Sequence, residues 1–462
     1  MRSATGTILL IALSGFLMGF DGSLFTGAVL FVKEQFALSD LQLGWTVSSH
    51  TLSATLAIFI AGPLADRVGR RTVLRIATLM FALSAIVAAF ASSYPVLIVA
   101  RLLSGLGVGS VLVAAPMYIA ELSSPAQRGR MVTITQLFIV LGILLASASN
   151  LLVIRLEPLA QDNWRWMLGI GVLPAVAYLV ATLFVPESPR WHAMHGRLAA
   201  ARRILTRAHG ASTAERELAE VCASLGRDTR RQDARLRDLW APELRRVLII
   251  GLVIGVVQQI TGINSVLAYA TMIFTQASGV AEGIERSFVQ TLFITLVNVV
   301  FTVAALLLID RVGRRPLMLF GTAGITLSLG VTALGFQISG GGLHSAWVLA
   351  GLLSFVACFA LSLGPGMWVL FSEIFPNRVR ALAISCVGLV NSTVCFFGQL
   401  VFPWQLEHLG GAQTFLIYTV FALLGVAMLA RVLPETRGRS LEELEESLVR
   451  HPEASSAASD SR

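Results

Sequence analysis

The sequence predicts an all-α membrane protein with twelve transmembrane helices arranged as two similar six-helix halves. Of its 462 residues, 55% are hydrophobic and only 13% are charged, and the mean hydropathy is +0.75. No soluble fold can bury that much apolar surface, whereas a lipid bilayer accommodates it. Apolar stretches of membrane-spanning length recur along the chain, and a loop motif returns about half a chain later. These observations together predict the class.

The repeated motif is GPLADRVGRR at 62–71, which returns in shortened form as DRVGRR at 310–315. Each copy lies between two apolar runs. Other landmarks repeat with it: Glu121 and Arg128 are echoed by Glu373 and Arg380, and PESP at 186–189 by PET at 434–436. A repeat period near half the chain length indicates two homologous membrane halves, as in transporters whose halves rock about a central site.

The hydropathy pattern places the expected spans and divides the chain into four parts. The first span contains Asp21 and several glycines but no small-residue cleavage site, so we expect it to be retained rather than removed as a signal peptide. The expected helices are near 6–31, 42–63, 73–92, 96–119, 130–153, 167–185, 247–272, 289–309, 316–338, 347–372, 381–402 and 413–433. The expected parts are an N-terminal half (1–189), a cytoplasmic helical linker (190–245), a C-terminal half (246–433) and a cytoplasmic tail (434–462).

The distribution of arginines predicts the orientation. Arginines crowd the loops after the second, fourth, eighth and tenth spans, the central linker and the tail, whereas the opposite loops have few basic residues. By the positive-inside rule both termini are cytoplasmic. The formal charge of +8 reflects this bias and is spread over separate loops, so it does not indicate nucleic-acid binding.

The linker and the tail have compositions of their own. Between 190 and 245, arginines and glutamates alternate with apolar residues at helical spacing, which predicts short amphipathic helices broken at Gly210 and Gly226. A purely solvated linker is the alternative. Ser440, followed by a run of glutamates, predicts a short capped helix in the tail. We expect the last ten or so residues, rich in Ser and Ala, to be disordered.

Enzyme, metal and cofactor functions find no support in the sequence. The four cysteines have no metal-ligand spacing and form no extracellular framework. The glycines of 105–109 resemble a nucleotide-binding loop only superficially, because they follow no strand and lack a Lys-Ser or Lys-Thr partner; close helix packing is the better interpretation. No nucleophile is paired with a base. We therefore expect neither an enzyme nor a bound cofactor.

Three motifs identify a resemblance over nearly the whole chain. They are PESPRW at 186–191, QQITGIN at 258–264 and PETRG at 434–438, and they accompany the paired loop motif. Together they resemble the sugar porter family of the major facilitator superfamily, and their pattern is similar to that of bacterial proton-coupled monosaccharide symporters. The resemblance implies the major facilitator fold, alternating access, a monosaccharide substrate and short cytoplasmic helices between the halves.

Two ionisable residues stand out inside the spans, Asp21 in the first and Arg101 in the fourth. Charges within a bilayer are costly, so each indicates function. A paired Asp and Arg would neutralise each other, and protonation of Asp21 would free Arg101 to change partners, which makes a two-state switch. The resemblance implies that Asp21 is the proton acceptor and Arg101 its partner. The alternative is a static structural ion pair.

Amide side chains near the middle of the spans indicate the substrate class. An amide both donates and accepts hydrogen bonds, as each sugar hydroxyl does, so an amide set favours a neutral polyol. The resemblance implies a sugar-binding role for a set that also includes one aromatic side chain: Gln136, Gln258, Gln259, Asn264, Asn298, Trp368 and Asn391. Each could instead form an interhelical hydrogen bond.

The sequence departs from the family pattern near this set. The family often has an aromatic residue where this chain has Ala268, and a Trp where it has Ser392. These departures leave the identity of the sugar open. Trp368 follows a Gly-Pro-Gly sequence that should bend the tenth span, and this bend is a candidate inner gate.

Charged residues at the cytoplasmic helix ends form a candidate gate. Ion pairs among them would hold the inner side shut in one state and break in the other. The candidates are Asp66, Arg70, Glu121, Arg128, Asp310, Arg314, Glu373 and Arg380. The resemblance adds Glu187 and Glu435. The alternative is that these residues only anchor the topology. His50 in the second span could titrate in the cycle or be a hydrogen-bonded packing residue.

The sequence thus predicts a proton-coupled symporter for a hexose or a pentose in the cytoplasmic membrane, working as a monomer with monosaccharide, proton and lipid as its partners and without nucleic acid. A passive sugar facilitator is the alternative, against which the retained Asp21 and Arg101 speak. A membrane sugar sensor and a drug exporter are less favoured, because the tail is short and the amides are polar.

Overall fold

The computed structural model describes residues 4–123, 128–156, 162–228, 236–278, 283–338, 341–376 and 379–436. The chain divides into two compact units, Met1–Gln232 and Asp233–Arg462. The regular elements of the described ranges are helices, without a strand.

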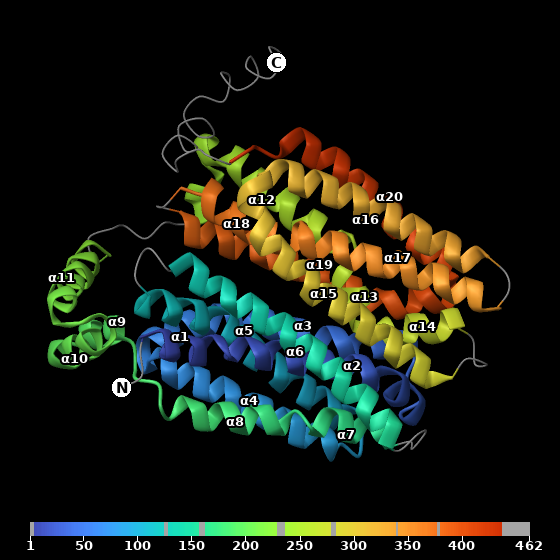
Figure 1. The fold of residues 1–462 in the computed structure, drawn as a ribbon, viewed down its shortest axis with the longest axis horizontal. Helices are drawn as coiled ribbons and strands as arrows, with labels where there is room; N and C mark the ends of the chain where they lie inside the picture. Colours follow the sequence, from blue (N-terminus) through green and yellow to red (C-terminus); the bar gives the residue numbers. More distant parts are fainter. Residues whose placement is uncertain are drawn as a thin grey trace, which may run out of the picture. The chain divides into compact units, whose positions relative to one another are not determined.

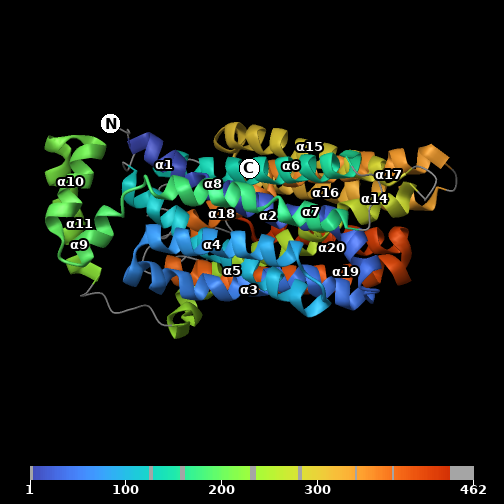
Figure 2. The same cartoon turned by 90° about the horizontal axis from the view of Figure 1, so that it is seen from below.

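Unit 1 is a bundle of long helices with three short helices at one end. In the bundle α3 packs on α5, α2 on α6, and α4 on both α5 and α8. The short helices α9, α10 and α11 stack beyond the end of the bundle at which α1 begins (Figures 1 and 2). The elements are α1 (Ala4–Ala12), α2 (Ser14–Gln35), α3 (Asp40–Val68), α4 (Arg70–Ala89), α5 (Tyr94–Leu122), α6 (Arg128–Leu156), α7 (Asn163–Gly169), α8 (Val172–Thr182), α9 (Pro189–Met194), α10 (Leu198–His209) and α11 (Ala211–Asp228).

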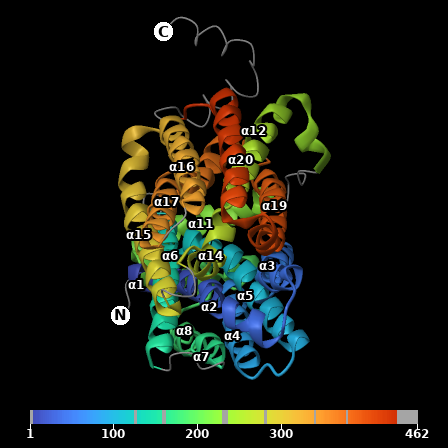
Figure 3. The same cartoon turned by 90° about the vertical axis from the view of Figure 1, so that its right-hand side faces the viewer.

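Unit 2 is a second helical bundle. Its helix α16 packs on α17 and α20, α12 packs on α19, and α15 packs on α17 (Figure 3). The elements are η1 (Leu236–Trp240), α12 (Pro242–Ile260), α13 (Ile263–Ala268), α14 (Ala270–Ser278), α15 (Ile284–Val312), α16 (Arg314–Gln337), α17 (Gly341–Leu361), α18 (Leu363–Ile374), α19 (Arg380–His408) and α20 (Gly410–Val432).

Twelve stretches of the described helices are long and apolar enough to cross a membrane. They coincide with the twelve expected spans, so that prediction is confirmed. The helices extend past several predicted ends because polar loop residues continue them; α3, for example, includes Asp66 and Arg67. Large apolar side chains such as Phe90 and Phe320 are exposed, as expected for surfaces that face lipid.

Two spans are broken beside prolines. The tenth is interrupted at Ser362, between α17 and α18, so the expected bend next to the Gly-Pro-Gly sequence is confirmed. Pro365 cannot donate to the carbonyl of residue 361 and its ring clashes with the preceding turn. The sixth span is likewise interrupted at Ile170 and Gly171, which are four and three residues before Pro174.

The seventh span contains a break that the sequence analysis did not predict. Helix α12 ends at Ile260 and α13 begins at Ile263, with Gly262 in the left-handed region at φ +81°. Glycine suits this position because it adopts a positive φ without steric cost. A Cβ atom at Gly262 would also lie 2.8 Å from the ring of Tyr418. The break therefore falls within the QQITGIN motif.

The linker is helical, as predicted, but one of its expected breaks was wrong. Gly210 ends α10 with φ +87°, which confirms the first break. Gly226 instead lies inside α11, where a glycine costs only about 1 kcal/mol and the neighbouring residues favour a helix. Gly196, with φ +72°, provides the other break. The expected tail helix and disordered end lie outside the described residues.

Candidate functional site

Asp21 lies in a hydrogen-bonded chain of three side chains from three helices of unit 1. The Ser104 hydroxyl on α5 donates to Oδ2 of Asp21 on α2. The same hydroxyl lies 2.9 Å from Nδ1 of His50 on α3. Ser104 is buried, whereas Asp21 and His50 are half-buried. A carboxylate and an imidazole thus share one hydroxyl inside the bundle.

Arg101 lies one turn from Ser104 on α5, on the same side of the helix. Its Nε donates to the carbonyl oxygen of Thr46 at 3.3 Å. Its guanidinium stacks over the ring of Phe25, 4.5 Å from the centroid, in a cation–π contact. The predicted pair therefore belongs to one polar cluster, formed by α2, α3 and α5.

Close approach of α3 and α5 makes this cluster possible. A Cβ atom at Gly105 would overlap the carbonyl oxygen of His50 and the hydroxyl of Ser53, and one at Gly109 would overlap the carbonyl oxygen of Ala54. Only glycine fits at these two positions, as in other closely packed membrane helices. The glycines of 105–109 therefore serve packing, as the sequence analysis favoured.

Four of the predicted sugar-binding amides form one network in unit 2. Asn391 donates to Gln258 Oε1 at 2.8 Å and to the carbonyl oxygen of Gly255 at 2.9 Å. Gln259 donates to Asn391 Oδ1 at 3.1 Å and accepts from Asn264 at 2.9 Å. The amides come from α12, α13 and α19, and the break at Gly262 brings Asn264 back to Gln259. The arrangement offers alternating donors and acceptors.

Of the other three predicted residues, two are on different helices of unit 2 and one is in unit 1. Asn298 on α15 is buried and accepts from Thr302 at 3.5 Å. Trp368 on α18 is 50% exposed and meets Phe371 edge to face; the preceding residue, Met367, contacts Asn391 through its sulfur at 3.8 Å. Gln136 is half-buried on α6 of unit 1.

At one end of unit 1, charged residues tie the helix ends to the segment after α8. Arg70, only 1% exposed, forms ion pairs with Glu121 at 2.9 Å and with Asp66 at 2.8 Å. Ser188 donates to Oε2 of Glu121, an oxygen that also accepts from Nε of Arg70 at 3.0 Å. Glu187 accepts from the backbone N–H of Arg71 at 3.1 Å, where a carboxylate complements the helix N-terminus.

Unit 2 repeats this arrangement at the equivalent positions. Arg314 pairs with Glu373 at 3.0 Å, and Thr436 donates to the same carboxylate at 2.6 Å. Glu435 accepts from the backbone N–H groups of Arg314 and Arg315 at 3.3 and 3.2 Å. The ion pairs described here each join residues of one unit.

Of the three remaining gate candidates, the structure describes the side chain of one. Arg380 donates to the carbonyl oxygen of Phe375 at 3.0 Å, at the end of α18. The side chains of Arg128 and Asp310 lie outside the described residues, so their predicted gate roles stay predictions.

Sequence reasoning missed three hydroxyls. Ser104 bridges Asp21 and His50, and its spacing of three residues from Arg101 was the available signal. Ser188 and Thr436 each follow the glutamate of a repeated Pro-Glu motif. Ser188 donates to the carboxylate of Glu121, and Thr436 donates to that of Glu373. Their shared place in the two repeats could have identified them. Within the described ranges, no cluster of three His, Cys, Asp or Glu side chains could hold a metal.

The chain is similar to known sugar transporters over nearly its whole length. The sequence profile described as "Sugar (and other) transporter" matches residues 7–448. The arabinose-proton symporter of Bacillus subtilis is 38% identical over 451 residues, covering 95% of either chain. The D-xylose transporter of Levilactobacillus brevis is 33% identical, covering 95% of this chain and 94% of the relative. The galactose-proton symporter of Escherichia coli is 34% identical, covering 96% and 93%.

Solved structures give the same picture. The inward-open form of the xylose transporter XylE from E. coli has a TM-score of 0.84 at 28% identity, covering 96% of this chain and 100% of the other. The proton:xylose symporter XylE bound to 6-bromo-6-deoxy-D-glucose has a TM-score of 0.75 at 28% identity, with 96% and 99% covered.

Proposed function

Because this chain belongs to the sugar transporter family of the major facilitator superfamily, we propose that it imports a monosaccharide together with a proton. Relatives named for arabinose, xylose and galactose support a pentose or hexose substrate. It is an integral membrane protein, and the cytoplasmic membrane is its location. The arginine distribution supports cytoplasmic termini.

The single observation that carries proton coupling is the carboxylate of Asp21 inside a span. It is half-buried, accepts from Ser104, and lies in one cluster with the buried Arg101. An ionisable group inside a span costs free energy, so its presence there indicates a function. Protonation of Asp21 would remove its charge, weaken its attraction to Arg101, and so bias the equilibrium between two transporter states.

The chain of side chains also supplies a route for the proton. A proton added at Nε2 of His50 would release the Nδ1 proton to Ser104 Oγ, whose own proton would pass to Asp21 Oδ2. One proton is gained, Asp21 becomes neutral, and the imidazole ends as the other neutral tautomer. His50 lies ten residues from the start of α3, or about 15 Å along the helix.

The amide network of unit 2 would bind the sugar. Its four amides hydrogen-bond one another, so sugar hydroxyls would exchange hydrogen bonds with them rather than meet unpaired groups. Trp368 offers an exposed apolar face suited to a sugar ring. Asn298 and Gln136 stay predicted contacts outside this network.

The remaining assignments follow the sequence analysis. The charged networks at the helix ends are proposed as gates that rearrange during the cycle. The halves are proposed to be 1–189 and 246–433, joined by the linker 190–245 and followed by the tail 434–462, and the protein is proposed to work as a monomer.

Uptake of labelled monosaccharides into proteoliposomes tests the function, for wild type and Asp21→Asn. With an inward proton gradient, wild type should concentrate one or more sugars, because proton entry drives sugar entry. Asp21→Asn should lose concentrative uptake yet retain sugar exchange, because the substitution changes none of the proposed sugar ligands. Asp162→Asn, which changes an exposed carboxylate paired with Arg165, is the control and should behave as wild type.

The other outcomes are equally informative. Equal, non-concentrative uptake by wild type and Asp21→Asn would make the protein a facilitator and Asp21 a structural partner. Failure to carry any sugar under any gradient would refute the substrate class.

A further inference from the structure

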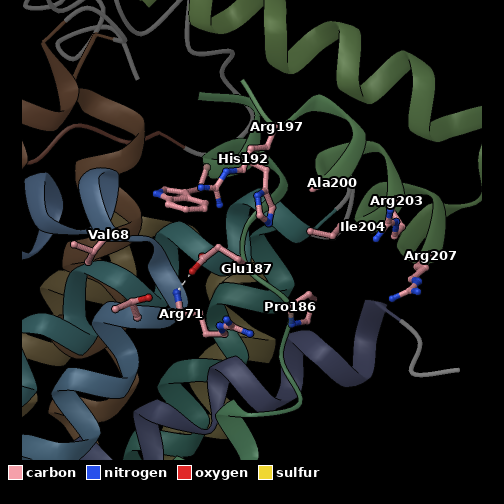
Figure 4. A pocket seen from close by; sticks show the side chains of 12 residues that line it. Val68, Arg71, Pro186, Glu187, His192, Arg197, Ala200, Arg203, Ile204 and Arg207 are labelled. Atoms are coloured by element: carbon pink, nitrogen blue, oxygen red, sulfur yellow. Dashed lines mark hydrogen bonds between the residues drawn. The ribbon is translucent and has the colours of Figure 1, made fainter. Parts of the chain in front are cut away.

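A basic cavity of about 380 Å³ lies in unit 1 among the end of α3, the start of α4, the segment before α9, and α9 and α10. Figure 4 shows its side chains arranged around this space. None of the roles proposed above uses the cavity itself. Its twelve lining residues include four arginines, Arg71, Arg197, Arg203 and Arg207, and one histidine, His192.

One carboxylate faces these cations, and it already has partners. Glu187 Oε1 accepts from the backbone N–H groups of Arg71, at 3.1 Å, and Ser188, at 2.9 Å. The bond to Arg71 is drawn in Figure 4. Glu187 is thus committed to the N-terminus of α4. The cavity keeps a large excess of positive charge.

Two buried nitrogen atoms of the lining lack a hydrogen-bond partner among the described residues. They are Nε of Arg71 and Nδ1 of His192. Arg71 uses Nη1 to donate to the carbonyl oxygen of Val185 at 3.2 Å, but Nε remains unsatisfied. Leaving a buried polar atom unpaired costs about 1–3 kcal/mol, so such atoms call for an explanation. An acceptor bound in the cavity would supply one once the lining shifts to expose these two shielded atoms.

The two arginines of α10 point to the same conclusion. Arg203 and Arg207 are four residues apart on one face of α10, where like charges repel. The neighbouring Arg202 faces elsewhere and pairs with Glu215 at 2.8 Å. The carboxylate of Glu215 is therefore directed to Arg202 and away from the cavity arginines. An anion bound in the cavity would relieve the repulsion between Arg203 and Arg207.

We propose that this cavity binds a phosphate-bearing anion. Guanidinium groups bind phosphate oxygens through paired, charge-assisted hydrogen bonds. The lining also includes Val68, Ile204 and Ala200, which suit the apolar part of a phosphate ester. Two sources share this chemistry: the head group of an anionic phospholipid and a soluble sugar phosphate. Occupancy would link α10 to the start of α4, where Arg70 anchors the charged network.

The test compares a cavity variant with a control of equal charge change in the full-length protein. Arg203→Gln/Arg207→Gln removes two exposed cavity arginines. Arg202→Gln/Arg216→Gln removes two arginines from the same short helices without touching the cavity. One arm measures binding of inorganic phosphate and glucose 6-phosphate to detergent-solubilised protein. The other measures retention of phosphatidylglycerol against phosphatidylcholine in nanodiscs.

We expect the cavity variant to bind at least one of these probes about tenfold or more weakly, because two charge-assisted contacts are lost, while the control matches wild type. Loss confined to phosphatidylglycerol identifies a lipid site, and loss confined to the soluble phosphates identifies a metabolite site. The proposal is overturned when none of the three probes (inorganic phosphate, glucose 6-phosphate and phosphatidylglycerol) distinguishes the cavity variant from the control, or when wild type binds none of them.

His192 provides an independent readout. Burial lowers its pKa; the carboxylate of Glu187 opposes this shift, and the charges of Arg197, Arg71 and His195 add to it. A bound anion would favour the imidazolium, so affinity should rise as the pH falls through the histidine range. Sulfate serves as the probe because its charge is constant over that range. His192→Gln should flatten this pH dependence; an unchanged profile would remove His192 from the site.

Discussion

At the residue scale, the hydroxyl of Ser104 lies between two ionisable side chains of unit 1. It contacts a carboxylate on one side and an imidazole on the other, within hydrogen-bonding distance of both. A hydroxyl donates one hydrogen bond and accepts others, so it can reverse its direction when Asp21 is protonated. This property distinguishes a relay from an ordinary interhelical bond.

Substitutions at His50 and Ser104 test that distinction. His50→Gln keeps a donor and an acceptor but cannot pass a proton on, and Ser104→Ala breaks the chain. Each should slow gradient-driven uptake by about tenfold or more, a typical contribution of a positioned proton-transfer group, and should alter the pH profile of uptake. Sugar exchange without net proton movement should continue. Initial rates across a pH series measure both effects.

One control removes a different hydroxyl, and a second replaces a different imidazole. Ser110→Ala removes a hydroxyl that bonds only its own helix, at Leu106, and His408→Gln changes an exposed histidine. Both should behave as wild type. Wild-type pH profiles in His50→Gln and Ser104→Ala would leave His50 as a packing residue.

The amides of unit 2 make a second prediction at this scale. Asn391→Ala removes the donor to Gln258 and Gly255 and the acceptor for Gln259. Because buried partners lose their bonds, KM for sugar exchange should rise by about 10–100-fold. Exchange rates over a range of sugar concentrations measure this change.

Thr393→Ala is the matched control for Asn391. Its hydroxyl is exposed and bonds only the carbonyl oxygen of Leu389 on the same helix. Its KM should stay at the wild-type value. An unchanged KM in Asn391→Ala would place the sugar away from this network.

At the scale of elements, the helix breaks decide which side chains can meet. The break at Gly262 allows Asn264 to fold back onto Gln259, five residues earlier, at 2.9 Å. In a continuous helix the two residues would be separated by about 500° of rotation and 7.5 Å of rise. Next to the break at Ser362, the carbonyl oxygen of Leu363 accepts from Gln258 at 3.3 Å. Both irregularities therefore serve the amide network.

Gly262→Ala tests the first break. The left-handed φ of +81° and the Tyr418 ring at 2.8 Å both oppose a Cβ atom, so the variant should lose about 1–3 kcal/mol of stability. Gly388→Ala is the control, because a Cβ there meets no atom within 4 Å. Thermal unfolding in detergent compares the two. Equal melting temperatures would show that the break tolerates a side chain.

At the scale of the whole molecule, the two units contain the same charged network. Arg70, Glu121, Glu187 and Ser188 correspond to Arg314, Glu373, Glu435 and Thr436, with the same roles. The copies differ in burial. The side chains of the Arg70–Glu121 pair are 2% and 11% exposed, whereas those of Arg314–Glu373 are 14% and 21% exposed.

This difference in burial predicts that removing the arginine of each pair lowers stability by different amounts. Arg70→Gln leaves the largely shielded Glu121 carboxylate, 11% exposed, without its charged partner and should destabilise unit 1 by about 3–5 kcal/mol. Arg314→Gln should cost less, because water reaches that pair. Arg67→Gln, which changes an exposed neighbouring arginine, should be nearly neutral. Thermal unfolding of the three variants gives the order, and a larger loss in Arg314→Gln would contradict it.

The sequence by itself determined the twelve spans, the twofold repeat and the family resemblance. Hydropathy acts locally along the chain, because a helix of about twenty apolar residues is driven into the bilayer whatever its neighbours are. It also singled out Asp21 and Arg101, because a charge inside an apolar run is visible without a structure. The linker helices followed from their periodicity.

Only the tertiary structure decided which side chains meet. Ser104 joins Asp21 to His50 because α2, α3 and α5 are rotated to face one another, and the rotation of a helix about its axis depends on packing at glycines such as Gly105. In unit 2, Asn264 joins the amide network because the helix break at Gly262 turns the chain back toward Gln259. The cavity at α10 is a further case, since its arginines are adjacent in space but spread from residue 71 to residue 207 in sequence.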